Sequence, residues 1–71
     1  MISEKFLDKV RNKLVHVDFL NDRGNIAFIE GVLDYELVGD EDDGTDFIDI
    51  TTETDFVRIP MKDVRKVYLK K

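Results

Sequence analysis

The 71-residue chain contains no cysteine and no tryptophan, and it has a single proline and four glycines. Without cysteine, a disulfide framework, a thiolate metal site and a thiol nucleophile are all excluded. The sequence also lacks an apolar run of about 18 residues, so we expect no membrane-spanning helix. Its first residues lack the apolar segment of a secretory signal. We therefore expect a cytoplasmic protein with no membrane partner.

At this length we expect one domain, residues 1–71. A domain of this size buries only about 60% of the surface of its unfolded chain, so its core is thin and a partner or a second copy adds stability. Hydrophobic residues make up 42% of the chain, which is enough for a globular fold.

The net charge of −5 conceals three blocks of different sign. Residues 24–57 carry 11 acidic residues and no basic one, residues 1–23 have a net charge of +1, and residues 58–71 have a net charge of +5. One interpretation is a solvated surface on which opposite charges partly neutralise each other across the fold. The other is two functional faces of opposite sign, or head-to-tail contact between copies.

Hydrophobic periodicity predicts one helix followed by five strands. Four apolar residues form one stripe at helical spacing: Phe6, Leu7, Val10 and Leu14. The stripe predicts a helix over residues 3–13, with Ser3 as its N-cap, that covers one end of the fold. Alternating apolar residues between turn signals predict strands over residues 14–20, 26–38, 46–52, 55–59 and 64–69.

Glycine and proline mark where these strands turn or bend. Gly24 lies in the hairpin turn 21–25, where it is free to adopt positive φ. Gly31 lies inside the second strand, where an isolated glycine indicates a bulge or a sharp bend. Pro60 ends the fourth strand. Residues 26–29 are apolar on both faces, so we expect this part of the second strand to be buried from two sides.

The predicted fold is mainly β: a small five-stranded antiparallel barrel of the Sm-like or SH3-like type, with an N-terminal α-helix. Short connections make successive strands antiparallel neighbours. A sheet of five short twisted strands with a bent second member curls into a barrel. We expect Gly31 and Pro60 to let the five segments close into one cylinder.

Both ends of the chain resemble the Hfq family of bacterial Sm-like proteins. Residues 6–13, Phe-Leu-Asp-Lys-Val-Arg-Asn-Lys, lead directly into the strand that begins near Val15, as the helix of that family leads into its first strand. Ile59, Val64 and Val67 match the apolar spacing of the second Sm motif. The resemblance implies an Sm-like barrel, and a ring in which the fourth strand of one copy pairs with the fifth strand of the next.

The residues with which Sm proteins bind RNA do not carry over to this chain. Asp34 stands in for the family's aspartate, but no asparagine follows it before the acidic loop. Pro60 and Met61 occupy the Arg-Gly positions of the second motif, and the Tyr-Lys-His signature of the Hfq family is absent. The resemblance therefore implies a fold and assigns no RNA-contact residue.

Candidates for contact with a partner or a nucleic acid lie in the basic last block. Phosphates are neutralised by clustered cations, often beside exposed aromatic rings on which bases stack. The candidate residues are Arg58, Lys62, Arg65, Lys66 and Tyr68. The alternative is a solvated last strand with a basic tail, and the acidic middle of the chain disfavours RNA.

The acidic loop 40–46 offers weak candidates for binding a divalent cation: Asp40, Asp42, Asp43 and Asp46. The calcium-binding EF-hand pattern fails, because aligning Gly44 with its invariant glycine puts Gly39 at the first ligand position and Ile50 at the last. We expect a solubilising loop without a metal, and no other cofactor.

His16 is the only histidine, and it is two residues from Asp18 on one face of a predicted strand. A His–Asp pair can orient a base, but Ser3 is the only serine and no nucleophile is near in sequence. The four glycines form no phosphate-binding loop. We therefore expect no enzyme activity, and an ordinary surface histidine.

These observations favour a non-enzymatic protein-interaction or assembly module of the small-barrel type, which associates with itself or with another protein. The candidate surfaces are the acidic loop 40–46 and the sheet edges near Arg58 and Arg65. The alternative is an Sm-like RNA-binding protein that uses the basic C-terminal strand.

Overall fold

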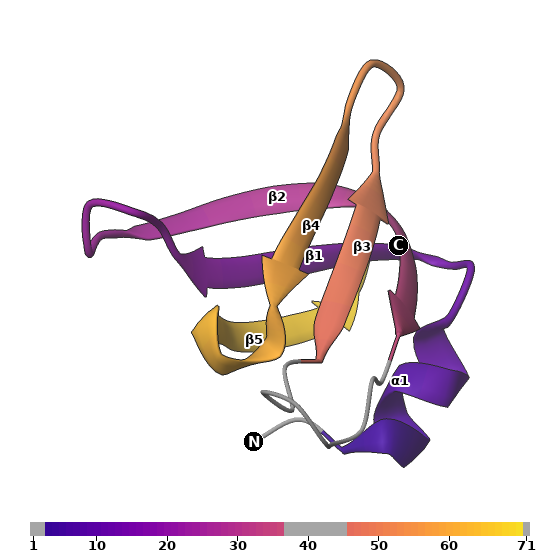
Figure 1. The fold of residues 1–71 in the computed structure, drawn as a ribbon. Helices are drawn as coiled ribbons and strands as arrows, with labels where there is room; N and C mark the ends of the chain where they lie inside the picture. The colour runs from indigo at the N-terminus through magenta and orange to yellow at the C-terminus, as the bar shows by residue number, and fades with distance from the viewer. Residues whose placement is uncertain (1–2, 37–45, 71) are drawn as a thin grey trace.

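The computed structural model describes residues 3–36 and 46–70, which form one helix and one five-stranded antiparallel sheet (Figure 1). Helix α1 spans Glu4–Val10. The strands are β1 (Leu14–Leu20), β2 (Ile26–Glu36), β3 (Phe47–Thr51), β4 (Phe56–Pro60) and β5 (Val64–Leu69), and the 3-10 turn η1 (Met61–Asp63) joins β4 to β5. The described part of the chain is therefore mainly β. None of its helices has the length and apolar character needed to cross a membrane.

Helix α1 is shorter than its apolar stripe, because the backbone leaves the helical conformation at residues 11 and 12. It begins where the Ser3 hydroxyl accepts a hydrogen bond of 3.2 Å from the backbone N–H of Phe6, which confirms the predicted N-cap. It ends at Val10, earlier than the predicted end at residue 13. Arg11 leaves the helical region with a ψ of 134°, and Asn12 has a φ of 64°, a left-handed conformation that asparagine tolerates better than most residues.

The helix lies against the C-terminal half of β2. Leu7 and Val10 of α1 are buried in the core. The backbone N–H of Asn12 donates to the Leu33 carbonyl at 2.6 Å, which fixes the end of the helix to β2. Leu14, which we placed on the helical stripe, instead begins β1 and is 47% exposed, because the chain leaves the helix before it.

The sheet has the strand order β4-β3-β2-β1-β5, and β2 is shared between its two halves. Residues 26–32 of β2 pair with β1, whereas residues 32–36 pair with β3. Among the described strands, the N-terminal half of β2 therefore has a partner on one side only. In Figure 1 this half forms a border of the sheet, and the β3–β4 hairpin crosses the other half.

Gly31 lies where the two halves of the sheet meet. The β1–β2 register runs through it without a shift, so it does not mark a bulge. A Cβ atom there would lie 2.5 Å from the Thr51 carbonyl oxygen and 2.7 Å from Cγ2 of Ile50. Glycine is needed because the end of β3 approaches the β2 backbone closely at this bend. The register irregularity of the described strands lies instead in the β1–β5 pairing, between Asp18 and Phe19.

The sheet does not close into the expected cylinder. β4 pairs only with β3, and β5 pairs only with β1, so no ladder joins β4 to β5 in the described residues. Pro60 ends β4, as predicted, and η1 then directs β5 to the edge of β1. Pairing with β1 occupies one edge of β5, and within the described residues the outer edges of β4 and β5 have no partner strand.

The core lies on the inner face of the bent sheet, and α1 adds Leu7 and Val10 to it. Its buried side chains are Leu7, Val10, Val15, Val17, Leu33, Tyr35, Ile48, Ile50, Ile59 and Val67. The expected burial of residues 26–29 from two sides is wrong. Ile26 and Phe28 are 60% and 65% exposed, because strand alternation turns them to the outer face, where no layer covers them in the described structure.

The β1–β2 hairpin closes as its sequence predicts. Gly24 has a φ of 81°, and its N–H donates to the Asn21 carbonyl at 3.0 Å. The Asn21 side-chain oxygen accepts from the backbone N–H groups of Arg23 and Asn25 at 2.9 and 3.0 Å. These hydrogen bonds stabilise the turn 21–25, which precedes the N-terminal end of β2.

Candidate functional site

The outer face of β2, β1 and β5 gathers the most distinctive polar and aromatic side chains of the described structure. Val15 and Val17 point into the core, so the alternating residues His16 and Asp18 point outward. In register with His16 lie Glu30 of β2 on one side and Tyr68 of β5 on the other. Residues far apart in sequence therefore meet on three adjacent strands.

The ring of His16 is stacked between two aromatic rings. Its centroid lies 5.1 Å from that of Phe28, with an interplanar angle of 9°, and 4.8 Å from that of Tyr68, with an angle of 14°. These separations are close to the spacing of neighbouring strands. The three rings form a column that crosses β2, β1 and β5.

Both nitrogens of His16 are bonded to carboxylates. Nδ1 lies 2.8 Å from Oε2 of Glu30, and Nε2 lies 2.9 Å from Oδ1 of Asp18. An ionised carboxylate only accepts hydrogen bonds, so when His16 is protonated both of its ring nitrogens donate to these carboxylates. Nζ of Lys70 lies 3.4 Å from the same Glu30 oxygen.

The pKa values of the pair follow from these contacts. The hydrogen bond to Glu30, followed by the hydrogen bond to Asp18, raises the pKa of His16 above its ordinary value of 6.5. The hydrogen bond from His16 is also the largest cause that lowers the pKa of Glu30 below 4.5. Each group therefore favours the charged form of the other.

His16 and Asp18 share a face, as the sequence indicated, but His16 is not an ordinary surface histidine. Its side chain is 15% exposed because Phe28 and Tyr68 cover both faces of the ring. The contact with Glu30 joins His16 to β2, and the stack with Tyr68 joins it to β5.

Arg58, the first of the predicted contact residues, is engaged by acidic neighbours. Its Nε donates to Oδ1 of Asp49 at 2.8 Å, and its Nη2 lies 3.3 Å from Oε1 of Glu36. The guanidinium carbon lies 5.2 Å from the centroid of the Phe47 ring. The hydrogen bond to Asp49 is the largest cause that raises the pKa of Arg58. Arg58, a contact candidate from the sequence, thus has intramolecular partners on β2 and β3.

The other predicted contact residues lie on η1 and β5. Nη1 of Arg65 donates to the Lys62 carbonyl at 2.9 Å. Lys66 and Tyr68 alternate outward on β5, and Tyr68 belongs to the ring column. The structure therefore brings Lys66 and Tyr68 together near His16, whereas Arg58 belongs to β4, at the other end of the strand order.

Three of the four metal-binding candidates, Asp40, Asp42 and Asp43, lie outside the described residues. Asp46 lies inside them, and its backbone carbonyl accepts a hydrogen bond of 2.7 Å from the N–H of Met61. Residues 3–36 and 46–70 contain no cluster of histidine and acidic side chains suited to hold a metal ion.

Sequence reasoning missed Phe28 and Glu30, and also an open groove beside them. The groove has a volume of about 550 Å³ and lies where β3 leaves β2; its lining includes Leu14, Glu30, Val32, Thr51, Thr52 and Glu53. Ile26, Phe28 and Glu30 alternate along the strand and so share its outer face. The sequence did not show this clearly, because residues 26–29 are all apolar. Local pattern alone gave no indication of the groove, because it forms between segments distant in sequence.

Comparison of the chain with protein-family models, with curated proteins and with solved structures found no match.

Proposed function

We propose that this chain is a non-enzymatic assembly module that associates with copies of itself through open strand edges. One observation carries the proposal: within the described residues, the outer edges of β4 and β5 and one side of residues 26–31 of β2 have no partner strand. An open edge presents unpaired backbone donors and acceptors, which pair readily with another strand.

Side-chain exposure near these edges supports the proposal. Phe56 on β4 is 61% exposed, and Phe28 on β2 is 65% exposed. Large apolar side chains beside unpaired backbone favour a strand-to-strand contact that also removes apolar surface from water. The Sm-like resemblance adds one specific arrangement to this proposal, in which β4 of one copy pairs with β5 of the next.

Light scattering over a range of protein concentrations tests the proposal. We expect a mass above the 8.3 kDa of a single chain that rises with concentration. A control at higher salt distinguishes the cause, because attraction between the acidic middle and the basic end is screened by salt, whereas backbone pairing persists. A mass of one chain at every concentration contradicts self-assembly.

One observation supports RNA binding as a second candidate. Lys66 and Tyr68 point outward from the same strand, in the block of net charge +5. Binding of a fluorescent U-rich or A-rich single-stranded RNA at low and moderate salt tests this alternative. Several phosphate contacts predict a steep loss of affinity as salt rises, and absence of binding at low salt contradicts it.

A further inference from the structure

We infer that the N-terminal half of β2 pairs with the same segment of a second copy, antiparallel and about a two-fold axis at Phe28. In this dimer, Arg23 of each copy lies at the groove beside Glu53 of the other. The inference rests on the self-association proposed above, for which it names the contact surface.

The backbone of this half-strand is directed toward the open side. Leu33 donates to the Lys13 carbonyl at 3.1 Å, so the backbone groups of Leu33 point toward the β1 side of β2. In an antiparallel ladder the direction alternates, so the backbone groups of Ile26, Phe28 and Glu30 point away from β1. Pairing of β2 with β3 begins only at Val32. These three residues therefore present donors and acceptors with no described partner strand.

The side chains of the same residues suit a two-fold contact. Ile26 and Phe28 are 60% and 65% exposed, and His16 stacks on one face of the Phe28 ring only. A register centred on Phe28 places Phe28 opposite its copy and Ile26 opposite Glu30 of the second copy. Over residues 26–30 this register uses all three outward residues, covers both apolar side chains, and places no like charges directly opposite each other.

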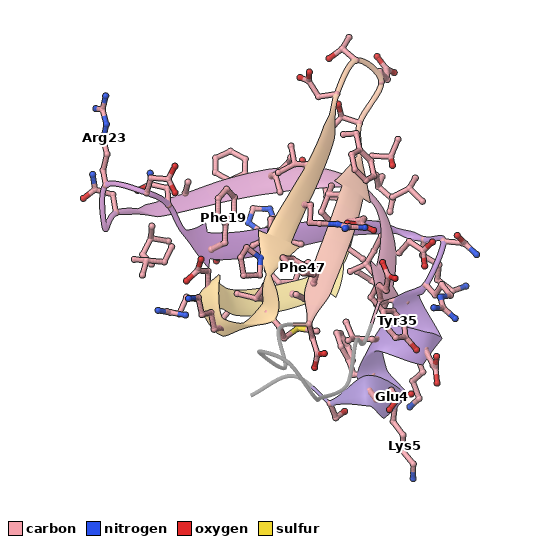
Figure 2. All side chains as sticks on the ribbon, viewed as in Figure 1. Glu4, Lys5, Phe19, Arg23, Tyr35 and Phe47 are labelled. Carbon is pink, nitrogen blue, oxygen red and sulfur yellow. The ribbon has the colours of Figure 1, made fainter. Side chains whose placement is uncertain are left out.

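Two charged side chains without an ion-pair partner among the described residues, Arg23 and Glu53, indicate that a second copy pairs with the open side of β2. Arg23 stands at the end of the β1–β2 hairpin, and Figure 2 shows its side chain extending from the turn into solvent. Within the described residues Arg23 forms no ion pair with an acidic side chain, and Glu53 forms none with a basic one. Glu53 lines the groove where β3 leaves β2.

The two-fold register brings these charges together. Antiparallel pairing centred on Phe28 places the hairpin end of one copy at the level of residues 32–33 of the other, where the groove lies. The groove provides space for the Arg23 side chain, and its lining includes Glu53 and the Glu30 carboxylate. Because only a half-strand is paired, the contact is small for a stable dimer, and we expect a concentration-dependent one.

A single introduced cysteine tests the axis directly, because the chain contains no cysteine of its own. Residues opposite each other in a hydrogen-bonded antiparallel pair have Cα atoms about 5.5 Å apart, which suits a disulfide. We expect Phe28→Cys to form a covalent dimer on mild oxidation. The matched control is Phe56→Cys, an exposed phenylalanine on β4, which we expect to remain mainly monomeric on a non-reducing gel.

A charge exchange tests the second contact in the Phe28→Cys background. We expect Arg23→Glu to reduce the rate of cross-linking severalfold, and the additional change Glu53→Lys to restore it. Both side chains are exposed and outside the core, so circular dichroism should show an unchanged fold. Restoration by the double variant supports the pairing of Arg23 with Glu53, and an unchanged rate in Arg23→Glu overturns it.

Failure of this inference is distinguishable from failure of the proposed function. If the unmodified protein is oligomeric by light scattering but Phe28→Cys cross-links no faster than Phe56→Cys, the β2 pairing is overturned and assembly through other edges stands. A preserved oligomeric mass in Phe28→Lys leads to the same conclusion. If the unmodified protein is monomeric at every concentration, both are overturned.

Discussion

At the scale of the residue, His16 combines two carboxylate contacts with two aromatic stacks. Its two carboxylate contacts, to Glu30 and Asp18, come from a neighbouring strand and from its own strand. Tyr68 covers it from a third strand. His16 therefore links three strands on the face opposite the core.

We predict that this link makes stability depend on pH. Because the pKa of His16 is raised in the folded state, its contribution is present below 6.5 and is lost as pH rises through the raised value. The lowered pKa of Glu30 acts oppositely: its contribution is present above 4.5 and is lost as pH falls through the lowered value. Together the two contributions are complete between these ordinary values.

Urea unfolding over a pH series, on the unmodified protein and on His16→Gln, measures this effect. Glutamine keeps hydrogen-bonding groups but does not titrate. The free energy of unfolding should fall more steeply with rising pH in the unmodified protein than in the variant. Parallel profiles for the two proteins on the alkaline side would show that His16 is not linked to folding.

At the scale of the element, β2 determines how the sheet is organised. It pairs with β1 along its first half and with β3 along its second. The change of partner occurs at Gly31, where the end of β3 lies too close for a side chain. Glycine is required here because β3 approaches the β2 backbone closely, and not because the backbone adopts a positive φ.

We predict that Gly31→Ala destabilises the protein by about 1–3 kcal/mol, the usual cost of overpacking a core. The added Cβ would meet the backbone oxygen of Thr51 at 2.5 Å, and backbone cannot move aside as a flexible side chain can. Gly24→Asn is the control, since Gly24 has a φ of 81° and no atom within 4 Å of the added Cβ. Thermal unfolding of both variants gives the comparison. Equal stability of Gly31→Ala and the unmodified protein would refute the close approach.

Some element bounds are readable from sequence and others are not. β1 and β5 have the predicted bounds, 14–20 and 64–69, because alternation and the adjoining turns are local signals. The predicted end of the second strand, residue 38, lies outside the described residues. The helix was predicted too long, because Leu14 of β1 continues the apolar stripe by coincidence. The backbone of Asn12, which bonds to Leu33 on β2, ends the helix instead.

At the scale of the whole molecule, the core is thin and strand edges of the described residues are open, so a second copy would stabilise the fold. The core of the described residues is small: ten buried side chains, eight from the strands and Leu7 and Val10 from the short helix. A chain of this size has limited apolar surface to bury. A second copy that covers Ile26 and Phe28 would therefore increase stability by binding only the folded state.

We predict a melting temperature that rises with protein concentration. Mass action stabilises a folded state that self-associates, and the effect disappears when the contact is removed. Scanning calorimetry of the unmodified protein and of Phe28→Lys over a wide concentration range measures it. The variant should show no dependence on concentration, and a melting temperature independent of concentration in both proteins would count against the dimer.

The sequence by itself determined the order of one helix and five strands, the cap at Ser3, the turn at Gly24 and the stop at Pro60. Each of these depends on residues within a few positions of one another. Only the tertiary structure decided which edges stay open and what surrounds His16. Strand pairing joins residues far apart in the chain, such as His16, Glu30 and Tyr68, and no local pattern encodes the partner that each edge selects.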